Sequence, residues 1–397
     1  MADSNRVQLA FAEEVTFATD PAANYDILRI TSESLSQETS FSSSDEINSR
    51  RTVQQLDRTD RGVTGNIAAN CYFGVAGNDG VSAFMRYAMG SGAFDNSGAV
   101  TTIISGVSCN VTQSSKTIAL ASGSFAADPS VGDWIYISGS ANSATNGWHK
   151  IATVDTTAPD GLTVETAIGA DESGVSLTIV KGDAITDGTT LTTLSMQRKY
   201  SDLSNQAAIF TGCAVNSWTL TAEGNDVITN SFDIVGYQET SRTSSAHSAT
   251  AGSELNSMTA IDGVQFVREN GVGIDATGFS FTVTNNIRKR YKLGTFGPDA
   301  FKQGDFVVTG TLQAYFASEA LFDKYLNNTA TSLSLCVSDE VDSRGNAFVF
   351  DFPNVEFTSG QRVAGGRNQD IIADLSWQAI YDSTDNYNMK MAVFPSA

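Results

Sequence analysis

Apolar and polar residues alternate along most of this chain, and a period of two is typical of half-buried β-strands. The segments Val63–Ala69 and Val308–Ala314 each show this alternation, with a glycine near the start. A different pattern, with apolar residues at i, i+1, i+4 and i+5, occurs in Ala83–Met89 and Ala320–Leu326. Such a stripe predicts a short helix that covers a sheet. The chain is therefore expected to be all-β, with a minor helical part.

Segments of the same kind follow one another in the same order twice. Each glycine-containing strand precedes one of the two helical patterns, and matching strand patterns lie around them. The further pairs are Ser34–Ser36 with Thr282–Thr284, Leu191–Met196 with Thr331–Cys336, Ile209, Phe210 and Val215 with Val349, Phe350 and Val355, and Ile228, Phe232 and Ile234 with Ile371, Leu375 and Trp377. Such internal order indicates a duplication. We expect two tandem β-sandwich or β-barrel units, each with one flanking helix.

Extra material rich in Thr, Ser and Ala, 98–182, lies between the first predicted helix and its next strand. Short alternating runs there, such as Trp134–Ile137 and Leu177–Val180, are separated by turn clusters. We interpret this part as a small β-barrel or immunoglobulin-like domain inserted in a loop. The expected division is an N-terminal arm at 1–28, a first unit at 29–97 plus 183–240, the inserted domain at 98–182, a linker at 241–274, and a second unit with a C-terminal arm at 275–397.

The chain is acidic, with a formal net charge of −20 from 44 acidic and 24 basic side chains. Wrapping nucleic acid requires clustered Lys and Arg, so the composition argues against that function. It is compatible with a conduit, because a negative wall repels DNA and makes only weak contact with it. The alternative is that the acidity only keeps the protein soluble.

Two basic segments interrupt this acidic background after equivalent strands of the two predicted units. The first holds Arg50, Arg51, Arg58 and Arg61, and the second holds Arg288, Lys289, Arg290 and Lys292. Basic loops at equivalent places suggest contacts between subunits, in which these side chains pair with acidic groups of a neighbour. The alternative is two ordinary solvated loops.

No catalytic, cofactor-binding or metal-binding motif is present in the sequence. His149 and His247 have no partner at triad or metal-ligand spacing, and we expect a surface or half-buried position for the first and an exposed linker for the second. Asp382 and Asp385 match no dedicated calcium loop. The four cysteines are far apart and form no CxxC pair. With no apolar signal segment and no apolar run of membrane length, we expect a protein made in a reducing cytoplasm.

Ordered segments over nearly the whole chain resemble the tail tube (major tail) proteins of tailed bacteriophages. The segments are Met1–Leu9, Glu13–Phe17, Arg29–Leu35, Phe210–Ser217, the Val308–Gly310 strand with its following helix, and, in the inserted part, Val131–Ile135 and Asn146–Lys150. The resemblance implies a structural virion protein and not an enzyme. Its β-sandwich or barrel units would join their sheets between subunits into a ring, which closes strand edges that would otherwise be exposed. Rings would stack through loops and arms, and double-stranded DNA would pass through without specific binding.

Because the chain holds two units, we expect a homotrimeric, pseudo-sixfold ring, with a homohexamer as the alternative. The resemblance also implies the tape measure, tail terminator and distal tail proteins as partners, no membrane, assembly in the host cytoplasm, and a final place in the virion tail. The inserted domain would lie on the outer surface, because the channel has no room for it. Two functions compete with this one: a secreted or surface β-sandwich adhesion protein, and a glycan-active β enzyme with a carboxylate pair in a cleft.

Overall fold

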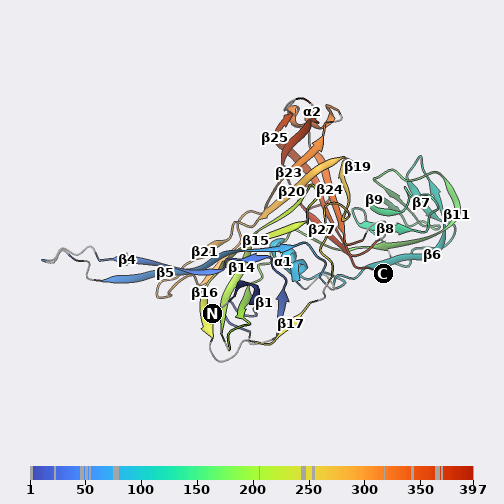
Figure 1. Ribbon diagram of the computed structural model, residues 1–397. Helices are drawn as coiled ribbons and strands as arrows, with labels where there is room; N and C mark the ends of the chain where they lie inside the picture. Colours follow the sequence, from blue (N-terminus) through green and yellow to red (C-terminus); the bar gives the residue numbers. More distant parts are fainter. Residues whose placement is uncertain are drawn as a thin grey trace.

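The computed structural model describes most of the chain (Figure 1). The described residues are 3–21, 24–44, 49, 52, 55–74, 80–127, 129–204, 206–242, 247–252, 255–316, 318–340, 344–362, 367 and 370–396. Strands dominate these residues, which contain two α-helices and one short 3-10 turn, η1 (Ser4–Arg6). The prediction of an all-β protein with a minor helical part is confirmed.

The strands of the first unit form two connected sheets. Their bounds are β1 (Val7–Glu13), β2 (Tyr25–Leu28), β3 (Ser32–Glu33), β4 (Ser36–Ser43), β5 (Leu56–Asn70), β13 (Leu194–Tyr200), β14 (Ala207–Glu223), β15 (Thr229–Gly236), β16 (Gln238–Arg242) and β17 (Ala249–Ala251). One sheet has the order β17-β2-β1-β13-β14-β16, and the other continues from the C-terminal half of β14 to β15, β5 and then β3 and β4. Gly212, with a φ of 65°, lies where β14 passes from one sheet to the other and adopts a conformation that side chains disfavour.

The strands of the second unit repeat this pairing order. Their bounds are β18 (Val264–Glu269), β19 (Val272–Gly273), β20 (Ala276–Thr284), β23 (Val307–Tyr315), β24 (Thr331–Ser338), β25 (Ala347–Arg362), β26 (Ile372–Ala379) and β27 (Lys390–Phe394). One sheet runs β19-β18-β24-β25-β27, and the other continues from the C-terminal half of β25 to β26, β23 and β20. The strands β1, β13, β14, β15 and β5 therefore correspond to β18, β24, β25, β26 and β23, and the β3–β4 segment corresponds to β20.

Irregularities in the ladders recur at matching positions of the two units. The register shifts lie between Val215 and Ser217 in β14, Phe357 and Ser359 in β25, Leu194 and Met196 in β13, and Thr331 and Leu333 in β24. Bulges at the same places support a common origin of the two units. They match Val215 with Phe357, so the sequence pairing of Val215 with Val355 is wrong by two residues. A shift of two keeps every side chain on the same face, which is why alternation alone does not reveal it.

The two units join side by side through their sheets. The C-terminal half of β14 pairs antiparallel with β20, from Ser217 opposite Thr284 to Glu223 opposite Gly278. The result is one sheet of eight positions in the order β3/β4-β5-β15-β14-β20-β23-β26-β25. We call it the joined sheet.

A continuous core lies beneath the joined sheet. It contains large buried rings from both units, namely Trp218, Phe232, Phe281, Phe350, Phe352 and Trp377. Trp218 of β14 contacts Phe281 of β20 edge to face, with ring centroids 5.0 Å apart. Burying a large apolar side chain contributes about 1.5–3 kcal/mol relative to exposure. The line where the units join is therefore a packed part of the core.

The two predicted helices are present, and their surroundings differ. All residues of α1 (Gly80–Ala88) are buried, whereas α2 (Ala320–Leu326) has no buried residue. Asn285 of the second unit donates a hydrogen bond of 2.7 Å from Nδ2 to the carbonyl oxygen of Ala88. The first helix thus lies at the joint between the units. The second lies on β25 at the far end of the second unit (Figure 1).

The inserted part forms a closed six-stranded barrel. Its strands are β6 (Thr101–Thr112), β7 (Thr117–Leu120), β8 (Trp134–Ser138), β9 (Gly147–Asp155), β10 (Gly161–Val164) and β11 (Glu172–Lys181), in the order β10-β7-β6-β11-β8-β9. The barrel has an apolar core of its own. Trp134 and Trp148 instead join a cluster with Cys336, Val349 and Phe394 of the second unit. The barrel therefore covers the face of β24, β25 and β27 that points away from the main core (Figure 1).

Three segments pair differently from the sequence interpretation. The expected N-terminal arm, 1–28, contributes β1 and β2 to a sheet. The expected linker, 241–274, contains β17, β18 and β19, and β18 pairs with β24. Strand β12 (Asp183–Thr186), assigned to the first unit, pairs with β27 of the second. The pairings of β1 with β13, of β18 with β24 and of β12 with β27 connect residues far apart in the sequence, where local patterns carry no information about partners.

Candidate functional site

One face of the joined sheet is turned away from the core and is mostly polar. In β14, Trp218 and Leu220 point into the core, while Thr219 and Thr221 point outwards. The same alternation in the neighbouring strands turns outwards Asn66, Ser231, Asp233, Ser280, Thr282, Thr309, Thr311, Ser376 and Gln378. We call this surface the polar face.

Side-chain hydrogen bonds cross the polar face from strand to strand. They join Thr64 to Glu38 at 2.9 Å, Asn66 to Ser231 at 2.7 Å and to Asp233 at 2.8 Å, Ser217 to Asp233 at 2.7 Å, Thr219 to Thr282 at 2.8 Å, and Ser280 to Thr311 at 2.7 Å. Cross-strand polar pairs of this kind each contribute roughly 0.2–1 kcal/mol. They also hold the side chains in place, so the polar face is a wall of fixed hydroxyl, amide and carboxylate groups.

The charge on the polar face has one sign. Across the body of the joined sheet, the segments 32–38, 63–70, 217–223, 229–236, 276–284, 307–315, 355–361 and 372–379 contain no Lys or Arg. Arg362 at the end of β25 points to the opposite face, over the ring of Phe322, and Arg58 and Arg61 lie in the projecting part of the β4–β5 hairpin. The acidic side chains that point outwards are Glu38, Glu223, Asp233, Glu356 and Asp374. A surface with carboxylates and no cations presents a negative potential to anything that approaches it.

The joined sheet ends in two edges that have no strand partner within the described residues. At one end, β3 and β4 pair with β5 on one side only. At the other end, residues 356–362 of β25 pair with β26 on one side only. Each edge presents a row of backbone N–H and C=O groups that another strand can pair with.

The two predicted basic segments lie next to each other. Arg58 and Arg61 belong to the long β4–β5 hairpin, which projects from the body of the molecule (Figure 1). The second segment belongs to β21 (Arg288–Arg290), which pairs with β22 (Ala300–Lys302). The guanidinium carbons of Arg58 and Arg61 lie 5.3 and 5.1 Å from the ring centroid of Phe296, which follows β21. The hairpins after equivalent strands of the two units thus meet in one region.

Some of these basic side chains are already engaged inside the chain. Arg61 stacks over Tyr237, with its guanidinium carbon 4.3 Å from the ring centroid, and donates a hydrogen bond to the Tyr237 hydroxyl. Arg290 donates two hydrogen bonds, of 2.9 and 3.1 Å, to Asp299, and these lower the pKa of the Asp299 carboxyl. Both arginines therefore have structural roles within the subunit.

The remaining predicted contacts are either more accessible or outside the described part of the chain. Lys289 lies against the backbone of Gly62. Arg288 is exposed on β21, and Lys292 is exposed in the loop after it. Arg50 and Arg51 lie outside the described residues.

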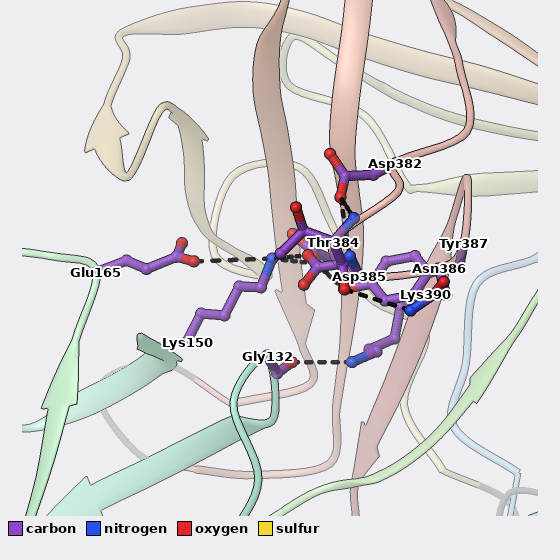
Figure 2. A network of polar contacts seen from close by, with 10 residues as sticks. Gly132, Lys150, Glu165, Asp382, Thr384, Asp385, Asn386, Tyr387 and Lys390 are labelled. Atoms are coloured by element: carbon purple, nitrogen blue, oxygen red, sulfur yellow. Dashed lines mark hydrogen bonds and ion pairs between the residues drawn. The ribbon is translucent and has the colours of Figure 1, made fainter. Parts of the chain in front are cut away.

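A buried network of ion pairs ties the barrel to the second unit (Figure 2). Lys150 Nζ of β9 lies 3.1 Å from Asp351 of β25 and 2.8 Å from Asp385 in the loop before β27. Burial by itself lowers the pKa of Lys150, but the nearby carboxylates outweigh burial and raise it. Tyr387 donates a hydrogen bond of 2.9 Å to Asp351, and Lys390 donates one of 2.9 Å to a barrel carbonyl. The network fixes the barrel against its neighbour.

The acidic pair considered from the sequence as a cation site takes part in this arrangement. Asp385 is a partner of Lys150. Asp382 accepts hydrogen bonds of 2.8 Å from the backbone N–H groups of Thr384 and Asp385 and thereby shapes the loop. Across the residues that the structure describes, no group of three or more His, Cys, Asp or Glu side chains could hold a metal ion.

Both histidines are less exposed than the sequence suggested. His149 in the barrel is 2% exposed, and its Nε2 lies 3.2 Å from the carbonyl oxygen of Thr145. Burial lowers the pKa of His149 to about 4, so the ring is neutral near pH 7. His247 is half-buried, stacks on Tyr25 with ring centroids 5.0 Å apart, and places Nε2 2.8 Å from Asp20. The expected surface or half-buried position of His149 is wrong because neighbouring parts of the barrel enclose its ring. The expected exposed position of His247 is wrong because Tyr25 and Asp20, far away in the sequence, lie against its ring.

The fold and the site define a class of protein: an all-β structural protein whose two similar units share a sheet with one acidic polar face and two open edges. The family model for the phage tail tube protein matches residues 4–379. The chain belongs to this family, which makes it a structural protein of the virion tail that assembles into the tail tube. No curated protein matches the chain. In the described part of the molecule, no helix has the length and apolar character needed to span a membrane.

Proposed function

We propose that this protein forms homotrimeric, pseudo-sixfold rings that stack into a tube and conduct double-stranded DNA into the host. The observation that carries the proposal is the joined sheet, in which two similar units meet edge to edge and leave an open edge at either end. Repetition of the same joint between chains produces a closed β-wall with no free edge. Six units close a ring when each joint turns by one sixth of a circle, and three chains supply six units.

Strand spacing favours three chains over six. Neighbouring strands lie about 4.8 Å apart, so three chains with eight positions each give a circumference of about 115 Å and a diameter of about 37 Å before strand tilt is included. Side chains occupy roughly 5 Å on each side of the bore, half the usual distance between packed sheets. The space that remains accommodates a DNA duplex with little excess. Six chains would double the diameter and leave a bore that DNA does not fill.

The polar face suits the channel side of this wall. It offers phosphates no Lys or Arg, so DNA gains no attraction that would hold it during passage. The opposite side of the joined sheet is covered by the core, the remaining sheets and, over the second unit, the barrel. In the proposed ring, the inserted domain would lie on the outside of the tube.

Ring stacking would use the region where the two basic segments meet. Arg288 and Lys292 are accessible for contacts with acidic groups of the next ring, and Arg50, Arg51, Arg58 and Lys289 belong to the same proposed set. Arg61 and Arg290 would act mainly by shaping the hairpins. An exposed ion pair contributes only about 0–1 kcal/mol, so stacking requires many such contacts repeated around the ring.

In this proposal the chain is divided into an N-terminal segment, two tandem tail-tube units, the inserted barrel and a connecting segment. The protein has a structural and not an enzymatic role. The tape measure, tail terminator and distal tail proteins are the proposed partners inside and at the ends of the tube, and assembly would take place in the host cytoplasm. Family membership supports these partners, because a tube of defined length needs one protein that sets its length and others that close its two ends.

Electron microscopy and native mass spectrometry of the purified protein test the proposal. Rings or tubes with a central channel are expected, and released rings should contain three copies of the 42.0 kDa chain. Rings with six copies would contradict the proposed trimer but would still be consistent with a tail tube. Strings of beads would favour the adhesion protein, and isolated globules the glycan-active enzyme.

A further inference from the structure

The strand pairing that joins the two units inside one chain provides a template for the contact between two chains. We propose that residues 359–362 of β25 pair antiparallel with residues 35–38 of a second copy, with Gln361 opposite Ser36, and that α2 is buried at this joint. The inference rests on the proposed ring and adds the partner segments, their register and the role of the exposed helix.

The equivalent of Ser36 in the second unit follows from its partner strand. Thr64 of β5 and Thr309 of β23 precede the two matching glycines of the duplicated strand. Ser36 lies opposite Thr64, and Thr282 lies opposite Thr309. Ser36 therefore occupies the place that Thr282 has at the joint inside the chain, and the sequence match of Ser34 with Thr282 is wrong by two residues.

The equivalent of Gln361 follows from the shared bulge. Ser217 of β14 and Ser359 of β25 are the first paired residues after matching register shifts. Two residues further along each strand come Thr219 and Gln361. Thr219 lies opposite Thr282 in the joined sheet, so Gln361 is placed opposite Ser36 of the next chain.

The side chains brought together by this register are compatible. Gln361 and Ser36 both lie on the polar face and extend its hydrogen-bonded ladder, as Thr219 and Thr282 do at 2.8 Å within the chain. In the same register Ser359 falls opposite Glu38, which pairs a hydroxyl donor with a carboxylate acceptor. Like charges directly opposite would destabilise the pairing, and none occur.

The different surroundings of the two helices support the same joint. At the joint inside the chain, α1 is fully buried, whereas α2 has no buried residue and Leu326 is 62% exposed. α2 lies directly on the open edge strand, because a Cβ atom on Gly360 would be 3.2 Å from Tyr325 and 3.4 Å from Phe322. A second copy paired along this edge would bring its own residues to α2, as Asn285 of the second unit reaches the end of α1 inside the chain. The occupant is therefore another copy of this chain.

Disulfide trapping in assembled rings tests the register. The variant Ser36→Cys/Gln361→Cys should, after mild oxidation, run as covalent dimers and trimers on a denaturing gel and return to monomer with reductant. The native cysteines are buried and free, so they add no background of their own. The variant Thr219→Cys/Thr282→Cys is the positive control, because its bridge stays within one chain and leaves the protein at monomer size.

A matched variant checks that the register, and not mere proximity, is detected. Ser34→Cys/Gln361→Cys moves one cysteine by two residues and should cross-link at least about fivefold less, since diagonal neighbours lie about 7–8 Å apart. In parallel, Leu326→Cys should react with a thiol reagent in the unassembled chain and be protected in rings. If rings of the Ser36→Cys/Gln361→Cys variant form no disulfide between chains, or if the Ser34→Cys/Gln361→Cys variant cross-links more strongly, the register is overturned and the ring stands. A wild-type protein that forms no rings would overturn the proposed function itself.

Discussion

Lys150 and Asp351 form an ion pair of 3.1 Å across the boundary between the barrel and the second unit, and their side chains are only 6% and 3% exposed. Charges removed from water to this extent are tolerated because each has a partner, and Asp385 and Tyr387 complete the set. The barrel is therefore held by directional contacts in addition to the apolar cluster around Trp134 and Trp148.

Removing the cation from this network should be strongly destabilising. Lys150→Ala removes the ammonium group that lies 3.1 Å from buried Asp351 and 2.8 Å from Asp385, and we expect a loss of about 3–5 kcal/mol in the free energy of unfolding. Urea denaturation of the full chain, followed by tryptophan fluorescence, measures it. Lys199→Ala, at an exposed position of β13, is the control and should change stability by less than about 0.5 kcal/mol. Equal stability of the two variants would show that the network does not anchor the barrel.

The buried histidine of the barrel should make stability depend on pH. The pKa of His149 is lowered to about 4, whereas an unfolded histidine titrates near 6.5, so the unfolded chain takes up a proton first as pH falls. Its contribution to stability is therefore full above about pH 6.5 and is lost toward about pH 4, with about 2 kcal/mol lost by about pH 5.

The variant His149→Gln isolates this contribution, because other groups also titrate in the same range. The free energy of unfolding of the wild type should fall by about 2 kcal/mol more than that of the variant between about pH 7 and about pH 5. Parallel pH profiles for the two proteins would contradict the assignment.

Basic side chains placed on the polar face should slow the passage of DNA. Thr309 and Gln378 lie opposite each other, both exposed. In virions carrying Thr309→Lys/Gln378→Lys, we expect intact tubes and DNA release slowed at least several-fold at low salt, with recovery as salt rises. The rate of triggered DNA release at two ionic strengths measures this. Thr156→Lys/Thr157→Lys on the exposed surface of the barrel makes the same charge change and should release DNA at the wild-type rate. If both variants slowed DNA release equally, the polar face would not line the channel.

Charge reversal at the accessible basic positions should impair stacking and spare the fold. For Arg288→Glu/Lys292→Glu, we expect a loss of long tubes with rings retained, because each weak contact is repeated around the ring. Sedimentation separates tubes from rings, and circular dichroism reports the fold. Arg290→Glu is a useful contrast, since it also breaks the in-chain contact with Asp299 and should disturb the β21–β22 hairpin itself. Tubes of normal length from the double variant would refute the stacking role.

Much of the architecture is readable from the sequence because it is local. Alternation in Val63–Ala69 and Val308–Ala314 identifies strands, since side chains of a strand point to opposite faces in turn. The helical stripe identifies α2 at its observed bounds, Ala320–Leu326, and most of α1. The absence of Lys and Arg from the sheet segments is also a property of the sequence. This absence of basic residues cannot be interpreted, however, until those segments are known to form one face of a sheet.

The tertiary structure alone decided which strands are neighbours. Strand alternation repeats every two residues, so Val215 matches Val355 and Phe357 equally well by pattern, and only the bulge in each ladder selects the second. The same holds for β12, whose partner β27 lies about two hundred residues away in the sequence. Pairings at such distances depend on the shared core, which no local pattern records. The sequence by itself determined a duplicated, acidic β protein, and the three-dimensional packing decided the joined sheet, its polar face and its open edges.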